Sequence, residues 1–420
     1  MNILVVGGGG REHAIALSLF KSPLTKKLIV APGNPGIEKF AECRPIVADD
    51  IDGQCKLAKD INADIVFIGP EIPLVLGLKD KLNNLGIKAF GPTAKAAQLE
   101  GSKTFSRKFC DRHNIPQPRF RYCSDLKSAE EEIKSLNGYC VVKADGLAAG
   151  KGVDVCETIE QALQASKEML EENKFGDAGK SILIEERING IEASVFAVAD
   201  GENVTLIGTA QDHKRAYDND EGPNTGGMGA ISPAPALNQD LIRIIKEKII
   251  IPTIQGMKSE DMEYEGILYA GIMLTKDGPK VIEFNCRFGD PETQVVLPRL
   301  KTDLVEIIKR SVEKNIKDFE IELIEDTAIT VVLASKGYPG SFKKQINLPS
   351  LNKFEKSKDI TIYHSGTSIN NEQNLVSNGG RVLCITSLGE NIQSCRKKAY
   401  DVISEINWGN GFYRKDIGRL

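Results

Sequence analysis

Short apolar runs separated by stretches with helical spacing fill the first hundred residues. Four of these runs are typical of buried strands: Asn2–Val6, Lys27–Ala31, Ile65–Ile68 and Ile87–Phe90. After the first run, Arg11–Phe20 carries apolar residues at the spacing of a helix. Strands that alternate with helices predict an α/β fold with a doubly wound parallel sheet, whose ligands bind at the carboxyl ends of the strands. We therefore expect Gly7–Gly10, Asn34 and Glu71 to face one crevice.

The same pattern continues through the rest of the chain. A helix is expected within Ser102–His113, starting near Lys103, and two prolines shortly after it mark a hinge. Further strands are expected at Tyr139–Lys143, Ile182–Glu186, Thr205–Ala210, Gly266–Leu274 and Val281–Asn285. Apolar runs at Val331–Ala334 and Val382–Thr386 indicate a small mixed α/β domain at the carboxyl terminus.

The stretch Val281–Gln294 has the most informative polar pattern. Its first five residues alternate apolar and polar side chains, so Glu283 and Asn285 project from the same face of a strand. A carboxylate and an amide oxygen side by side suit a hard cation such as Mg²⁺. Arg287 follows on the same parity and would supply positive charge for a reaction at a phosphoryl group. The alternative is a surface ion pair between Glu283 and Arg287 on an edge strand.

Four glycines, Gly7–Gly10, connect the first strand to the first helix. A glycine turn before a positive helix end suits a phosphate group. The dinucleotide pattern G-x-G-x-x-G fails, because it requires glycine where Glu12 or His13 stands. The second strand also lacks the terminal acidic residue that binds a ribose. Nicotinamide binding is therefore not expected, whereas a small substrate that carries phosphate is. The alternative is a turn that serves packing alone.

A second glycine-rich loop, Ala144–Val153, follows the expected strand that ends in Lys143. Its glycines, Gly150 and Gly152 among them, permit close approach of backbone to phosphates, and Lys143 would add charge. The Walker A pattern is met only in part, because Gly152 stands where serine or threonine is required. The alternative is a mobile hairpin tip that binds nothing.

Composition narrows the class of protein. A chain of 420 residues is too long to fold around one hydrophobic core. Its formal charge of −4 argues against a dedicated nucleic-acid binder. No apolar run approaches the roughly 20 residues of a membrane span, and the start of the chain has no cationic signal region. Nine cysteines without a C-x-x-C spacing indicate reduced thiols, and four dispersed histidines do not suggest zinc. We expect a cytoplasmic protein of several domains.

Six long motifs occur in a fixed order along this chain. They are GGGGREHA at Gly7–Ala14, PGNPG at Pro32–Gly36, VVKADGLAAGKGV at Val141–Val153, DHKR at Asp212–Arg215, GPNTGGMGA at Gly222–Ala230 and EFNCRFGDPETQ at Glu283–Gln294. With these motifs the chain resembles the ATP-grasp superfamily, and within it the phosphoribosylamine–glycine ligase family. The resemblance covers essentially the whole chain.

The resemblance implies a division of the chain into domains. An amino-terminal α/β domain that binds substrate would span residues 1–100, followed by a linking helix and hinge over 101–117. An ATP-grasp lid would span 118–185, and the ATP-grasp body would span 186–325. A carboxyl-terminal domain would cover 326–420.

The resemblance also implies an ATP site between lid and body. Lys103 and Lys143 would contact the phosphates beneath the loop that contains Gly150 and Gly152. Further residues implied at the site are Glu185 and Glu186 at the adenine, Glu192 at the ribose hydroxyls, and Glu283 and Asn285 as ligands of Mg²⁺ or Mn²⁺. Many ATP-grasp enzymes carry another acidic metal ligand on the preceding strand, but here Ile267–Leu274 contains no acidic residue.

The implied reaction joins glycine to 5-phosphoribosylamine through glycyl phosphate, with ATP as co-substrate. Alignment and positive charge would carry most of the catalysis, with Arg287 and Lys143 as catalytic residues. Residues expected to hold the two small substrates are Gly9, Gly10, Asn34, Asp212, Lys214, Asn224, Thr225, Asp290 and Lys336. The partners would be these small molecules and neither nucleic acid nor membrane, and the chain would act as a monomer.

Two other classes of protein remain open from the residues. One is an ATP-grasp ligase for another acid, such as a carboxylase. The other is a regulatory protein that binds ATP without turnover, although the presence of Lys143, Glu283, Asn285 and Arg287 together argues against it.

Overall fold

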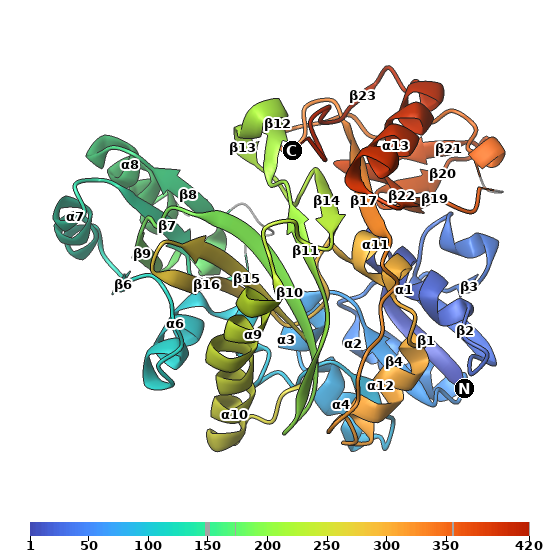
Figure 1. Cartoon of the computed structure of the whole chain (residues 1–420), viewed down its shortest axis with the longest axis horizontal. Helices are drawn as coiled ribbons and strands as arrows, with labels where there is room; N and C mark the ends of the chain where they lie inside the picture. The colour runs from blue at the N-terminus through green and yellow to red at the C-terminus, as the bar shows by residue number, and fades with distance from the viewer. Residues whose placement is uncertain (148–151, 173, 355–356, 420) are drawn as a thin grey trace.

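The computed structural model describes residues 1–147, 152–172, 174–354 and 357–419 (Figure 1). Its amino-terminal part is a parallel sheet of order β3-β2-β1-β4-β5. The strands are β1 (Asn2–Gly7), β2 (Lys27–Pro32), β3 (Glu42–Cys43), β4 (Ile65–Ile68) and β5 (Ala89–Phe90). The helices are α1 (Gly10–Phe20), α2 (Ile51–Asp60), α3 (Glu71–Val75), α4 (Leu78–Asn84) and α5 (Gln98–Gly101). The predicted doubly wound parallel sheet is confirmed, although β5 is shorter than the apolar run that predicted it.

A four-stranded antiparallel sheet of order β6-β9-β7-β8 follows the hinge. Its strands are β6 (Phe120–Cys123), β7 (Cys140–Ala144), β8 (Val153–Cys156) and β9 (Ile182–Glu186), and its helices are α7 (Leu126–Ser135) and α8 (Ile159–Leu170). Apolar residues of both helices, such as Ile133 and Met169, pack with Val142 and Ile184 of the sheet in a small separate core. We call this unit the lid.

The helix α6 (Lys103–Arg112) leads into the lid. Ser102 caps it by accepting a hydrogen bond from the backbone N–H of Phe105. The predicted helix start near Lys103 is therefore confirmed, and the cap explains it.

One large sheet of nine strands joins the remaining parts of the chain, in the order β16-β15-β10-β11-β14-β17-β22-β19, with β23 beside β17. The strands are β10 (Ile191–Asp200), β11 (Val204–Asp212), β14 (Gly229–Ser232), β15 (Glu265–Thr275), β16 (Gly278–Asn285), β17 (Thr327–Ser335), β19 (Ile360–His364), β22 (Arg381–Gly389) and β23 (Gly411–Phe412). The pairing of β14 with β17 carries this sheet across the boundary predicted at residue 325. Figure 1 shows the lid and the carboxyl-terminal part at opposite sides of the molecule.

Smaller elements complete the fold. A hairpin forms from β12 (Arg215–Tyr217) and β13 (Glu221–Asn224), and a three-stranded sheet from β18 (Ile346–Asn347), β20 (Thr367–Ile369) and β21 (Leu375–Ser377). The other helices are α9 (Gln239–Ile245), α10 (Ile251–Ser259), α11 (Thr293–Val296), α12 (Leu304–Val312) and α13 (Ile392–Ile406). None of the helices in the described part of the chain has both the length and the apolar character that crossing a membrane requires.

One hydrophobic core crosses from the amino-terminal sheet into the large sheet. The ring of Phe67 on β4 stacks on that of Phe288 with centroids 6.5 Å apart, and Phe288 in turn lies 6.0 Å from Phe196 of β10. All three side chains are buried. The segment after β16 is therefore packed against the amino-terminal sheet.

Candidate active site

Two lysines lie where the lid meets the large sheet. Lys143, at the end of β7, places Nζ 2.8 Å from Oε2 of Glu185 and donates to the carbonyl of Ile282 at 3.2 Å. Lys103, the first residue of α6, donates to the carbonyl of Gly146 at 3.1 Å. Burial lowers the pKa of both lysines. Both predicted phosphate contacts thus lie at one junction, on two different elements.

The carboxylate of Glu185 forms ion pairs with Arg107 and Lys143. Its carboxylate is 2% exposed and accepts hydrogen bonds from Arg107 of α6 at 2.7 and 2.9 Å. Burial by itself would raise the pKa of Glu185, but Arg107 and Lys143 outweigh it and lower that pKa to about 2. The adenine contact expected of Glu185 stays a prediction. Arg107 was missed by the sequence analysis, because nothing in an amphipathic helix marks one arginine as buried.

The neighbouring Glu186 is tied to the hinge. Its Oε1 accepts a hydrogen bond from the backbone N–H of Arg119 at 3.0 Å and lies 3.5 Å from Nζ of Lys280. Its side chain is half-buried, so its role at the adenine also stays a prediction.

The start of the lid loop is anchored to α6 by Asp145. One oxygen of this carboxylate accepts from the N–H of Thr104 at 2.7 Å and from the hydroxyl of Ser102 at 3.1 Å. At the end of the loop the carbonyl of Gly152 accepts from the N–H of Ala144 at 2.9 Å. The predicted contact of Gly150 lies outside the described residues.

Lys214 lies at the centre of an acidic cluster. Its Nζ is 3.0 Å from Oε2 of Glu192 on β10 and 3.5 Å from Oε1 of Glu283 on β16. Lys214 follows β11, which runs two residues further than predicted because Asp212 pairs with Ala230 of β14. Burial opposes the charge of Lys214, yet these two carboxylates hold its pKa well above the usual range.

Two more carboxyl groups face Lys214 from the buried side. Burial raises the pKa of Asp212 and that of Glu292, and the neighbouring carboxylates add to the effect on Asp212. Glu292 is 4% exposed and accepts a hydrogen bond from the hydroxyl of Ser194 at 3.4 Å. Glu292 lies inside the motif Glu283–Gln294, which could have marked it as a site residue, but no role was predicted for it from the sequence.

The predicted metal ligands lie on β16, which confirms the strand that their alternation predicted, and β16 is an edge strand of the large sheet. Glu283 and Asn285 flank the buried Phe284 and are both half-buried. Among the described residues no group of three or more His, Cys, Asp or Glu side chains is arranged to hold a metal. One carboxylate and one amide still fit Mg²⁺, which is often bound by one or two carboxylates together with substrate phosphates.

Arg287 is held by two carboxylates of the amino-terminal part. Its Nε is 3.2 Å from Oε2 of Glu71, and its Nη2 is 2.7 Å from Oε1 of Glu100. Glu100 also accepts from the N–H of Cys286 at 2.7 Å. Arg287 therefore pairs with Glu71 and Glu100 of the amino-terminal part, whereas Glu283 pairs with Lys214. The expected parity ends because β16 stops at Asn285.

The amino-terminal glycine turn is partly capped from within. Glu12 accepts from the N–H of Gly9 at 2.7 Å and from Nε of Arg11 at 2.6 Å. A side chain at Gly8 would overlap the backbone of Gly33, so packing also requires glycine at this turn. A Cβ at Gly9 would lie 3.0 Å from the Glu12 carboxylate and 3.7 Å from Oδ2 of Asp290. Gly9 thus faces Glu12 and Asp290, and its expected contact with substrate stays a prediction.

Asn34 has its hydrogen bonds satisfied within the protein. Its amide donates to the carbonyls of Gly8 and His364 at 2.9 Å each, and its oxygen accepts from the N–H groups of Gly36 and Ile37 at 2.9 and 3.1 Å. An amide group offers two donors and two acceptor lone pairs, so this set is complete. Asn34 can hold substrate only by giving up one of these bonds, and the structure assigns it to joining the glycine turn to β19.

Asp290 lies beneath the glycine turn with a cation that the sequence analysis missed. Arg381, at the start of β22, donates to the carbonyls of Asp290 and Gly226 at 2.6 Å each and lies 3.4 Å from Oδ1 of Asp290. Lys336, the cation expected here, is instead exposed beside Trp408 in a different hollow. The reason is topological, since β22 rather than the end of β17 supplies the side chain at this point.

Thr225 and Asn224 precede β14. Thr225 is buried, donates from its hydroxyl to the carbonyl of Lys214 at 2.8 Å and accepts from the N–H of Gly227 at 2.9 Å. Thr225 therefore holds the loop that carries Lys214. Asn224 pairs with Arg215 in the hairpin and is half-buried.

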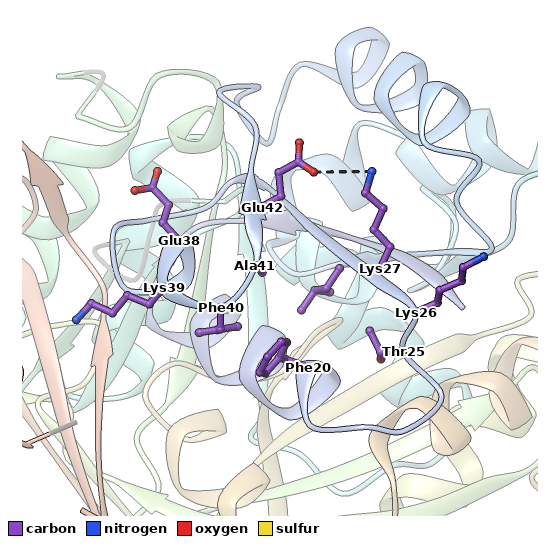
Figure 2. Close-up of a pocket in the computed structure, with 10 residues that line it drawn as sticks. Phe20, Thr25, Lys26, Lys27, Glu38, Lys39, Phe40, Ala41 and Glu42 are labelled. Carbon is purple, nitrogen blue, oxygen red and sulfur yellow. Dashed lines mark ion pairs between the residues drawn. The ribbon is translucent and has the colours of Figure 1, made fainter. Parts of the chain in front are cut away.

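A separate hollow opens on the amino-terminal part, away from these residues. Figure 2 shows its aromatic wall, in which Phe20 and Phe40 lie 5.3 Å apart, and the ion pair between Lys27 and Glu42 at 3.8 Å. No predicted site residue lines it. Because none of the predicted motifs contributes to it, this hollow does not compete with the cluster around Lys214 as a candidate active site.

Three family patterns cover nearly all of this sequence. The description "Phosphoribosylglycinamide synthetase, N domain" matches residues 1–100, the ATP-grasp (A) domain of the same synthetase matches 101–293, and its C domain matches 328–420. A phosphoribosylamine–glycine ligase of Escherichia coli O157:H7 is 46% identical over 421 residues, which is 100% of this chain and 98% of the relative. The chain belongs to the phosphoribosylamine–glycine ligase family.

Other members of the family also match this chain over nearly its full length. The ligase of Caulobacter vibrioides is 46% identical over 419 residues and covers 100% of this chain, with 98% of its own length matched. The crystal structure of the ligase from Thermotoga maritima superposes with a TM-score of 0.86 at 30% identity, covering 99% of this chain and 100% of that one. A biotin carboxylase of Campylobacter jejuni, with a TM-score of 0.72 at 16% identity, shares the fold alone. The predicted family, the α/β fold class and the assignment to the ligases are confirmed.

Proposed function

We propose that this chain uses ATP to join glycine to 5-phosphoribosylamine, which yields glycinamide ribonucleotide, ADP and phosphate in purine biosynthesis. Membership of the family over the full chain supports this reaction, since the relatives carry its name. The substrates are small molecules.

The first step forms glycyl phosphate. A carboxylate oxygen of glycine attacks the γ-phosphorus of ATP, and the bond from that phosphorus to the bridging oxygen of ADP breaks. Lys103 and Lys143 contact the phosphates at the junction of lid and sheet. Arg287, oriented by Glu71 and Glu100, neutralises the charge that develops.

The second step forms the amide. The amine nitrogen of the ribosylamine attacks the carbonyl carbon of glycyl phosphate, phosphate leaves with the bonding electron pair, and the nitrogen loses a proton. The mixed anhydride reacts with water, so closure of the lid protects it. The phosphate of the ribosylamine lies near Gly9 and Gly10, where Arg381 supplies the charge first expected of Lys336.

The observation that carries the proposal is the acidic cluster around Lys214. Lys214 interacts with all four carboxyl groups, Asp212, Glu192, Glu283 and Glu292, whereas Lys103, Lys143 and Arg287 act on Glu283, and Arg287 also acts on Glu292. Burial raises the pKa of Asp212 and of Glu292, so a ligand that brings positive charge, such as the ammonium group of glycine, would stabilise their ionised forms. Asp212 and Glu292, the two on the buried side, receive that ammonium group.

The remaining carboxylate, Glu283, holds Mg²⁺ or Mn²⁺ together with Asn285. When bound, such an ion neutralises charge on the phosphoryl group in transfer. Glu192 is freed from Lys214 to bind the ribose of ATP. The nine cysteines are all free thiols, which supports a reducing cytoplasm as the location. The chain is proposed to act as a monomer.

The test is ADP release by the purified protein with ATP, Mg²⁺ and freshly generated ribosylamine. We expect turnover with glycine and none with bicarbonate. Glycine labelled with ¹⁸O in its carboxylate should transfer one labelled oxygen to the released phosphate, because that oxygen bridges carbon and phosphorus in glycyl phosphate.

Each alternative gives a different result. Turnover with bicarbonate in place of glycine would assign the chain to carboxylation. Tight ATP binding without ADP release, when both substrates are present, would identify a regulatory nucleotide-binding protein. Turnover with glycine but unlabelled phosphate would exclude glycyl phosphate while leaving the overall reaction intact.

A further inference from the structure

Two cations share one buried carboxylate at the base of the lid. Arg107 binds Glu185 through both of its oxygens, with Nε 2.7 Å from Oε1 and Nη2 2.9 Å from Oε2. Nζ of Lys143 lies 2.8 Å from the same Oε2. The three side chains come from α6, β9 and β7, and those of Arg107 and Glu185 are each 3% exposed. Glu185 therefore has one more cation than its charge requires.

The two cations also share a carbonyl of the large sheet. Nη2 of Arg107 donates to the carbonyl of Ile282 at 2.6 Å, and Lys143 donates to the same oxygen at 3.2 Å. Arg107 donates further to the carbonyl of Val281 at 3.1 Å. The strand pairing is irregular at this point, since Gly271 pairs with Glu283 and the next residue, Ile272, pairs with Val281. This bulge leaves the Ile282 carbonyl free for the two cations.

The hydrogen bonds of Arg107 and those of Lys143 differ in how easily they can break. The planar guanidinium of Arg107 makes four bonds to Glu185, Val281 and Ile282, and its fork matches a carboxylate. Lys143 makes one ion pair and one hydrogen bond, through a flexible stem. Removal of Lys143 from Glu185 leaves the carboxylate neutralised by Arg107. Without Arg107, the same movement would leave a bare buried carboxylate, which is strongly destabilising.

We propose that Arg107 is a positioning residue that keeps Glu185 neutralised, so that Lys143 is released to the phosphates of ATP. Arg107 itself touches no substrate in this proposal. The inference rests on the proposed function, because it takes Lys143 as the phosphate contact. Helix α6 would then contribute two residues to the ATP site: Lys103, which contacts the phosphates, and Arg107, which neutralises Glu185.

The proposal predicts how ATP affinity changes when Arg107 is replaced alone and when Arg107 and Glu185 are replaced together. In Arg107→Met, Lys143 is the only cation in the described part of the chain that still forms an ion pair with Glu185, so ATP affinity falls by about 10- to 100-fold. In Arg107→Met/Glu185→Gln there is no carboxylate to neutralise, and ATP affinity returns to within about threefold of that of Glu185→Gln alone. Arg107→Lys keeps the charge without the fork and gives an intermediate affinity.

The experiment is titration of each full-length variant with ATP and Mg²⁺ by calorimetry, alongside the KM for glycine and a thermal melt. A KM for glycine close to that of the wild type is expected in Arg107→Met. If Arg107→Met does not fold, Arg107→Lys and the double variant still test the proposal. Unchanged ATP affinity in Arg107→Met or Arg107→Lys overturns it, and so does a double variant as weak as the single one.

A further variant separates this inference from the proposed function. Lys143→Met should lose ATP affinity whatever Arg107 does. If Lys143→Met binds ATP as the wild type does, Lys143 is not a phosphate contact and the assignment of the ATP site fails. If Lys143→Met is weak while Arg107→Met is normal, the ATP site stands and only the role of Arg107 is overturned.

Discussion

Nζ of Lys214 lies 3.5 Å from Oε1 of Glu283, so the predicted metal ligand already faces a protein cation. Lys214, followed by the other cations nearby, lowers the pKa of Glu283 and keeps it ionised. A divalent cation that binds Glu283 must therefore compete with Lys214. The competition would couple metal binding to the release of Lys214 toward its other carboxylate partners.

Loss of the charge on Glu283 should stop catalysis without unfolding the chain. We expect Glu283→Gln to reduce ATP-dependent turnover by at least about 10²-fold, as for other lost groups that stabilise charge. Steady-state ADP release at a range of Mg²⁺ concentrations measures this. The matched control is Glu202→Gln, an exposed partner of Lys258 at 2.9 Å. Near wild-type turnover of Glu283→Gln at ordinary Mg²⁺ would remove Glu283 from the metal site.

Substitution in the lid loop should weaken ATP binding while the fold persists. Gly152 is buried, and its carbonyl accepts from Ala144, so a branched side chain in Gly152→Val would crowd the loop. We expect the same of Gly150→Val from the sequence. ATP titration and thermal melting measure the two effects, with Gly409→Val as a control at an open position. Normal ATP binding by both lid variants would make the loop a surface hairpin.

The amino-terminal glycine turn should affect one substrate only. A side chain in Gly9→Val would lie against Glu12 and toward Asp290. We expect a higher KM for phosphoribosylamine and nearly unchanged ATP affinity, because the proposed ATP site lies at the lid. NADH should not bind, since the dinucleotide pattern fails. Binding of NADH that NAD displaces, or a variant that loses ATP and retains the ribosylamine, would contradict this account of the turn.

Two buried histidines should make the protein lose stability in acid. Nδ1 of His13 accepts the backbone N–H of His364 at 2.9 Å, which joins α1 to β19. Burial lowers the pKa of His13 and lowers that of His364 to about 3. In the unfolded chain both have a pKa of about 6.5, so between about pH 6.5 and 3 the unfolded state binds more protons. Stability is therefore lost as the pH falls through this window.

Thermal melts between pH 7 and 4 measure this loss. The free energy of unfolding should decrease by about 1.4 kcal/mol per pH unit for each histidine that titrates only on unfolding. His364→Gln removes one of the two groups and should reduce the slope below pH 6. Equal slopes in the wild type and in this variant would show that His364 does not titrate on unfolding.

Local patterns along the chain were enough to predict most of the strands and helices near the candidate site and the family. Period-2 alternation placed Glu283 and Asn285 on one face of a strand, because side-chain direction in a strand is a local property. The parallel amino-terminal sheet followed from apolar runs separated by helices, and the six motifs identified the family. Alternation, apolar runs and motifs all depend on residues that are close together in the sequence, so they can be recognised without a structure.

The pairing of charged side chains, in contrast, depends on how distant segments pack. Arg107 and Glu185 are 78 residues apart, and Arg381 and Asp290 are 91 apart, so no local pattern connects them. Arg381 lies beside Asp290, whereas Lys336 is exposed beside Trp408, and the side-chain amide of Asn34 makes its hydrogen bonds within the protein. Burial is what gives these contacts their strength, since a charge removed from water must find a partner. Burial depends on packing between distant segments, and the sequence pattern does not report it.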